Sequence, residues 1–142
     1  MNVITYEDDF HAWTQQQAEL LRNQDFSDLD WSNIAEEIES MGRSEKRQLE
    51  SRLEVLMMHM LKWQYQPNRQ SRSWQFTIKE QRLRIEKLLS ENPSLRSQLQ
   101  QYVEKSYPLA VLRAERETGL SDFPVECPFE LEEVLEKSYE II

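Results

Sequence analysis

Glycine is almost absent from this chain, which holds two glycines in 142 residues. Sheets, barrels and phosphate-binding loops rely on glycine for tight turns and for close approach of the backbone, so these architectures lose support. The sequence is dominated instead by Leu, Glu, Gln, Arg and Lys, which are strong helix formers. The composition therefore predicts an all-α protein.

Apolar residues at spacings of three and four predict two helices in the first third of the chain. The first is expected over 6–24, where Thr5 is a suitable N-cap. Asp30 is expected to cap the second helix, and Gly42 is expected to end it in a left-handed conformation. One face of this second helix carries Ile34, Ile38 and Met41.

Two longer apolar seams follow Gly42. A third helix is expected to end at Pro67, with apolar residues in steps of four and three: Leu49, Leu53, Leu56, Met60 and Trp63. The same steps recur in a fourth helix that ends near Asn92: Trp74, Ile78, Gln81, Ile85 and Leu88. This spacing is typical of helices that pack left-handed against a neighbour.

A fifth helix is expected to begin at Pro93, capped by Asn92, and to continue to Gly119 along Leu95, Leu99, Tyr102, Ser106 and Leu109. Pro108 lies inside it and predicts a kink or a break, because proline removes a backbone hydrogen bond. A last amphipathic helix carries Leu131, Val134 and Leu135. The sequence thus predicts one domain over 1–142, a compact bundle of five to six helices with one kinked or broken near Pro108.

Charge is unevenly distributed along the sequence, whose formal net charge is −9. Residues 1–42 carry a charge of −9, residues 43–96 carry +6, and residues 97–142 carry −6. A basic middle between two acidic ends predicts internal pairing, although each exposed pair contributes only tenths of a kcal/mol.

The sequence favours a cytoplasmic protein. Its single cysteine, Cys127, has no partner for an internal disulfide, and the N-terminal residues lack the pattern of a secretory signal peptide. The longest uncharged apolar stretch, 55–61, is far shorter than the ~20 residues that cross a bilayer, so no membrane span is expected.

Several separated motifs occur in a characteristic order: LDWSNIAEEIESMGR, RSWQFTIKEQR, NPSL, ETGL and FPVECPF. This order resembles the bacterial family called domain of unknown function 29, and the resemblance covers nearly the whole chain. It implies a compact helical bundle, common in cyanobacteria, and implies no activity, cofactor or catalytic residue. Asn23 departs from the family pattern, in which many members have Gly, and this would alter how the first helix ends.

Only half of a helical di-metal site is present in the sequence. Such sites use carboxylates and histidines that project inward from facing helices. Asp8 and His11 share a helix face, and Glu37 and His59 are further weak candidates on later helices. We expect His59 to be a partly buried structural side chain and no metal to be bound. A metal-dependent enzyme is therefore the least favoured interpretation.

The segment 62–74 interleaves basic and aromatic residues, a composition suited to phosphate contact and base stacking. Trp63 and Trp74 also lie on the apolar seams, where an aromatic side chain is more often part of the core. The net charge opposes a polyanion at long range. The candidates for binding an anion or a partner are Arg43, Arg47, Lys62, Arg69, Arg72, Trp74 and Arg82.

Arg43 and Arg47 form a like-charged pair four residues apart near a predicted helix start, which calls for an anionic partner. The nearby carboxylates of Glu36, Glu37 and Glu39 favour internal pairing over an external anion. The preferred interpretation is a non-catalytic protein-interaction or accessory module with an unidentified protein partner. The alternative is nucleic-acid binding through residues 62–84. The oligomeric state stays open, and a homo-oligomer is compatible with the sequence.

Overall fold

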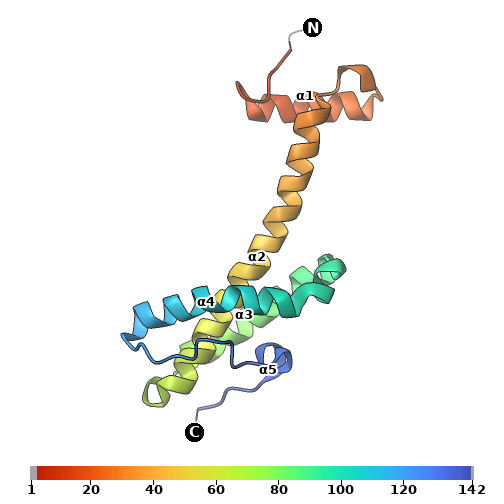
Figure 1. The fold of residues 1–142 in the computed structure, drawn as a ribbon. Coiled ribbons are helices and arrows are strands. Elements are labelled where there is room, and N and C mark those ends of the chain that lie inside the picture. Colours follow the sequence, from red (N-terminus) through yellow and green to blue (C-terminus); the bar gives the residue numbers. More distant parts are fainter. Residues whose placement is uncertain (1–2, 142) are drawn as a thin grey trace. The chain divides into compact units, whose positions relative to one another are not determined.

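The computed structural model describes residues 3–141, which contain five α-helices, three short 3₁₀ helices and no β-strand (Figure 1). The all-α prediction is confirmed. The α-helices are α1 (Phe10–Arg22), α2 (Trp31–Tyr65), α3 (Arg72–Glu91), α4 (Leu99–Thr118) and α5 (Leu131–Glu136). The 3₁₀ helices are η1 (Phe26–Asp28), η2 (Pro67–Arg69) and η3 (Pro93–Gln98). None of the helices in this part of the chain combines the length and apolar character needed to traverse a membrane.

The chain forms two compact units, unit 1 (Met1–Ser44) and unit 2 (Glu45–Ile142), and α2 contributes residues to both. Compact units of one chain can still unfold in a single cooperative transition. The expectation of a single domain over 1–142 therefore stays a prediction.

In unit 1, α1 begins later than the apolar spacing predicts. Residues 6–8 form a turn in which the Thr5 hydroxyl accepts from the Asp8 amide at 3.2 Å. Asp9 is the true N-cap, since its carboxylate accepts from the Ala12 amide at 3.0 Å. Thr5 as the cap and 6–24 as the helix were therefore wrong, because Asp9 offers a cap one turn further on.

The predicted break at Gly42 is also wrong, because α2 is continuous from Trp31 to Tyr65. Gly42 does not have the positive φ of a left-handed C′ residue, and a glycine inside a helix costs only about 1 kcal/mol. Ion pairs from Arg43 to Glu36 at 3.0 Å and to Glu39 at 3.8 Å bridge successive turns on either side of this glycine. The start of α2 is as predicted: the Asp30 carboxylate accepts from the Asn33 amide at 3.4 Å.

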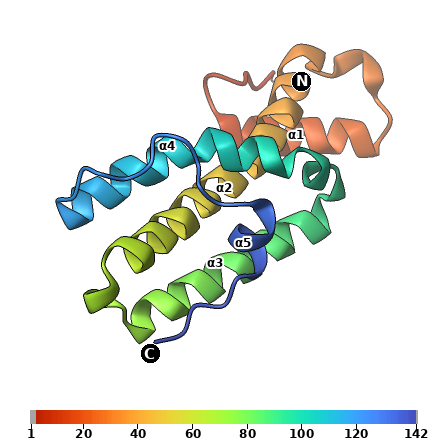
Figure 2. The same cartoon turned by 60° about the horizontal axis from the view of Figure 1, so that its bottom comes forward.

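Unit 2 is built around the C-terminal half of α2, with α3 and α4 lying along it (Figure 2). The predicted α2 seam forms the centre of the core: Leu49, Leu53, Leu56, Met60 and Trp63 are all buried. On α3, Ile78, Gln81, Ile85 and Leu88 are buried as expected, whereas Trp74 is half-buried. The buried Val134 joins the short α5 to the same core, so the predicted last helix is confirmed.

Helix α4 continues through Pro108 without a break. Pro108 and Glu104, whose carbonyl loses its hydrogen bond to the proline nitrogen, are both exposed, so that carbonyl is available to water. The buried face on either side, which includes Tyr107 and Ala110, holds the helix together. Of the two predicted outcomes at Pro108, a kink or a break, the break does not occur. Gly119, with φ of 75°, ends α4 in the left-handed conformation.

The start of the fifth predicted helix was misplaced. The Asn92 side chain does not cap a new helix; its amide donates to the Leu88 carbonyl at 3.0 Å, at the end of α3. Residues 93–98 form η3, and α4 begins only at Leu99. Leu109, which the seam placed in the core, is exposed instead.

Candidate interaction surface

An apolar stripe lies exposed on the part of α2 that belongs to unit 1. Trp31, Ile38 and Met41 are 62%, 64% and 67% exposed, and Ile34 between them is half-buried. Their spacing of three, four and three residues places all four side chains on one helix face. We call these four residues the α2 stripe. A contiguous apolar patch on a protein surface often marks a site of interaction with a partner.

The α2 stripe sits on a rigid helix start, because a network centred on Asp30 ties α1 to α2. The Trp13 indole donates to the Asp30 carboxylate at 3.0 Å, and the Asn33 amide side chain donates to it at 2.8 Å. The Asp30 backbone amide donates to the Gln17 side chain at 2.8 Å. These hydrogen bonds, that from Asn33 above all, lower the pKa of Asp30 and keep it ionised.

Aromatic packing reinforces this junction. Tyr6 and Trp13 meet edge to face with ring centroids 4.9 Å apart, and Phe10 stacks on Trp13 at 5.8 Å. The Tyr6 hydroxyl donates to the Glu37 carboxylate of α2, which raises the pKa of Tyr6. Unit 1 therefore holds its part of α2 from the side, next to the α2 stripe and not over it.

Unit 1 is also strongly acidic. It holds ten Asp and Glu residues but only two basic residues, Arg22 and Arg43, which gives a formal charge of −8. Unit 2 has fifteen basic and sixteen acidic residues, which gives −1. Nearly all of the net charge of the protein thus resides in the unit that carries the α2 stripe.

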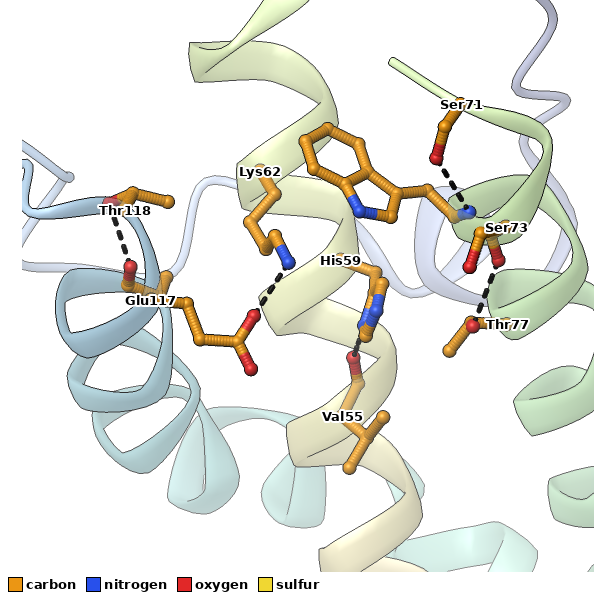
Figure 3. Close-up of polar contacts among 10 residues, drawn as sticks. Val55, His59, Lys62, Ser71, Ser73, Thr77, Glu117 and Thr118 are labelled. Carbon is orange, nitrogen blue, oxygen red and sulfur yellow. Dashed lines mark hydrogen bonds and ion pairs between the residues drawn. The ribbon is translucent and has the colours of Figure 1, made fainter. Parts of the chain in front are cut away.

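A second notable group of side chains lies in unit 2, where Lys62 joins three helices. The Lys62 ammonium of α2 lies 2.6 Å from the Glu117 carboxylate of α4 (Figure 3). It also lies 4.7 Å from the ring centroid of Trp74 on α3. The hydrogen bond from Lys62 is the main cause that lowers the pKa of Glu117. Lys62 and Trp74 are thus engaged with one another and with Glu117.

His59 lies one turn before Lys62 on α2, and its Nδ1 is 2.8 Å from the Val55 carbonyl (Figure 3). Because a carbonyl only accepts, the neutral ring carries its proton on Nδ1. Burial, followed by the charge of Lys62, lowers the pKa of His59. The arrangement suits a neutral imidazole packed in a three-helix contact, as the sequence led us to expect.

The structure does not gather the predicted anion-binding residues into one site. Arg43 pairs with Glu36 and Glu39 in unit 1, which confirms internal pairing for that residue. Arg82 is half-buried, and its guanidinium donates to three backbone carbonyls at the end of α5, those of Glu133, Val134 and Lys137, at 2.6–2.9 Å. Backbone carbonyls thus hold Arg82, and it has no ion pair with a carboxylate in the described residues. Within residues 3–141, three candidates are exposed and without an ion pair: Arg47, Arg69 and Arg72.

The weak metal candidates are likewise dispersed. Asp8 and His11 are exposed in unit 1, Glu37 bonds to Tyr6, and His59 belongs to unit 2. Across residues 3–141, no three His, Cys, Asp or Glu side chains are grouped so that they could hold a metal ion.

The exposure of the α2 stripe is the feature that sequence reasoning missed, because Ile34, Ile38 and Met41 resemble an ordinary core face. At 3.6 residues per turn Trp31 and Leu49 are five full turns apart and fall on the same helix face, so no signal in the sequence separates the stripe from the core seam.

The sequence matches the family model described as "Domain of unknown function DUF29" over residues 5–140. The chain belongs to the DUF29 family. This match confirms the resemblance of its motifs and supplies no activity for DUF29 members. No curated protein and no solved structure matches the chain.

Proposed function

We propose that this DUF29 protein is a non-catalytic protein-interaction module and that the α2 stripe is its docking surface. The observation that carries the proposal is the exposure of Trp31, Ile38 and Met41 in a row on one helix face. Burial of such side chains contributes about 25 cal/mol for each Å² of apolar surface removed from water, so a partner gains free energy by covering them.

Two potentially reactive side chains support a role without catalysis, because each is occupied in packing. Burial raises the pKa of the Cys127 thiol, whereas a nucleophilic cysteine requires a lowered pKa. His59 is bonded to the backbone of its own helix.

Site-specific photo-crosslinking in the native host tests the proposal. A photoreactive residue is placed at Ile38 in the full chain, and in a control at Leu83, which is 73% exposed on α3. We expect a discrete protein adduct from position 38 that is absent from position 83 and that mass spectrometry identifies. Equal adducts from both positions, or none, contradict the proposal.

Nucleic-acid binding remains the second candidate function. It is favoured by the exposure of Arg69 and Arg72, which have no ion pair within the described residues. It is weakened by the internal contacts of Lys62, Trp74 and Arg82. These three of the seven candidate residues contact other parts of the chain, so they are less available to a nucleic acid.

A further inference from the structure

We infer that the partner of the α2 stripe is a basic amphipathic helix of another protein. This inference rests on the proposed function and adds the chemistry of the occupant. It follows from three properties of unit 1: its unbalanced charge, the linear shape of the stripe, and the small residues that border it.

The unbalanced charge selects a cationic partner. Among the described residues of unit 1, Glu36 and Glu39 are the only carboxylates in ion pairs, and both share Arg43. Asp9 caps α1, Asp30 accepts hydrogen bonds from neutral groups, and Glu37 accepts one from Tyr6. None of these three carboxylates has a cationic partner among the described residues, so the formal charge of −8 makes unit 1 attract a basic surface and repel an acidic one.

The shape of the stripe selects a helix. Its four residues extend over ten steps of α2, about 15 Å at 1.5 Å per residue. A partner helix with apolar residues at positions i, i+3 or i+4, and i+7 matches such a row. Two helices in this arrangement pack with their axes roughly 8–10 Å apart.

The borders of the stripe allow this approach. At 3.6 residues per turn, Ala35 and Gly42 flank the stripe on one side, and Asp30 and Glu37 flank it on the other. A Cβ added at Gly42 would meet nothing within 4 Å, so packing inside the chain does not account for a glycine in this helix. A partner helix could lie close to α2 over the small residues, with its basic side chains near the carboxylates.

The same charge argues against a second copy of this chain as the occupant. In such a dimer, unit 1 of one copy would pack against unit 1 of the other, and each has a formal charge of −8. The repulsion between these like charges costs electrostatic free energy.

Three labelled synthetic peptides of about 18 residues test the inference by fluorescence anisotropy with the full-length protein. The first has a leucine face and a Lys/Arg face. The second has the same leucine face and a Glu face, and the third has the composition of the first in an order without an amphipathic face. We expect the first to bind more tightly than the other two, and to weaken as NaCl is raised from about 50 to about 300 mM.

Variants of the protein locate the binding. Ile38→Asp should weaken the first peptide at least about tenfold, whereas the control Leu83→Asp, which also adds a charge at an exposed apolar position, should leave it unchanged. Glu37→Gln, which removes the charge of a carboxylate that flanks the stripe, should weaken it by roughly two- to fivefold and reduce its dependence on salt. Circular dichroism verifies that each variant keeps its helices.

Several results would overturn the inference. If the Glu-faced peptide binds as tightly as the first peptide, the charge of the partner does not matter. If the non-amphipathic peptide binds as tightly as the first, an apolar helix face is not required. A dimer that Ile38→Asp abolishes in sedimentation experiments makes a second copy the occupant. If no peptide binds but the crosslink at position 38 persists, the proposed function stands and this partner chemistry is wrong; if the crosslink is absent as well, both fail.

Discussion

The ammonium of Lys62 lies 2.6 Å from the carboxylate of Glu117, although the two residues are 55 positions apart in the sequence. The Lys62 side chain is 11% exposed and the Glu117 side chain 48% exposed. The pair therefore has one member that depends on its partner for solvation and one that water can still reach.

This asymmetry predicts unequal effects of removing each partner. Glu117→Gln leaves the buried ammonium without a counterion and should cost about 1–3 kcal/mol of unfolding free energy. Lys62→Met keeps the apolar stem and leaves only an accessible carboxylate, so it should cost less. Denaturant unfolding of the two single variants and the double variant measures this difference. A larger loss for Lys62→Met would contradict the assignment of the buried partner.

His59 predicts a dependence of stability on pH. Its pKa is lowered in the folded state, so below the usual value of about 6.5 the unfolded chain binds protons more readily than the folded one. Unfolding free energy should therefore be highest above about pH 6.5 and fall as the pH is lowered toward the folded-state pKa. His59→Gln should flatten this slope. Identical slopes in the wild-type protein and His59→Gln would show that His59 does not contribute.

Core positions were the part of the fold that the sequence predicted best. The seam from Leu49 to Trp63 is buried because its repeat of four and three residues forces one face toward neighbours, whatever the exact helix ends. The boundaries were less predictable. Thr5 and Asp9 are both good N-caps, and the choice of Asp9 depends on tertiary contacts of Tyr6 and Trp13 that no local pattern specifies.

Leu53 lies at the centre of that seam and is fully buried. Leu53→Ala should cost about 2–5 kcal/mol, because it removes buried methyl groups and leaves a cavity. The exposed Leu83 provides the matched control, since Leu83→Ala removes the same atoms from a position open to water. Thermal unfolding followed by circular dichroism compares the two. Equal losses of stability would mean that the α2 seam is not the core of unit 2.

The two glycines should respond in opposite ways to replacement by alanine. Gly42 lies in α2 with open space where the methyl group of an alanine would stand, so Gly42→Ala should raise stability by roughly 0.5–1 kcal/mol. Gly119 has a φ of 75°, which strains any residue with a Cβ, so Gly119→Ala should lower stability. Both changes are measured by denaturant unfolding. Loss of stability in Gly42→Ala would reveal a backbone conformation other than the continuous helix.

The candidate site was harder to predict than the core. A stripe such as Ile34, Ile38 and Met41 indicates that a face will be covered, but its sequence does not distinguish cover by the same chain from cover by another molecule. Lys62 and Trp74 illustrate the opposite error: their composition suggests a binding surface, yet they contact each other across two helices. Only tertiary packing separates these cases.

The interaction proposal also predicts weak binding to nucleic acids. Titration of single-stranded RNA and of duplex DNA at two salt concentrations should show no submicromolar binding near physiological ionic strength, because the net charge of −9 opposes a polyanion. Tight binding that is lost when Arg69 and Arg72 are both changed to Glu, in a protein that keeps its helices, would favour the nucleic-acid alternative.

The division of charge between the units gives the isoelectric point of about 4.8 an uncommon physical meaning. Near this pH, unit 2 has a positive net charge, because some of its sixteen Asp and Glu side chains are protonated. Unit 1 has ten Asp and Glu side chains and two arginines, so its net charge stays negative. A net charge of zero then describes a polarised molecule and not an uncharged one. Neighbouring molecules can attract one another through unlike units, and added salt, which screens such attraction, should redissolve protein that precipitates there.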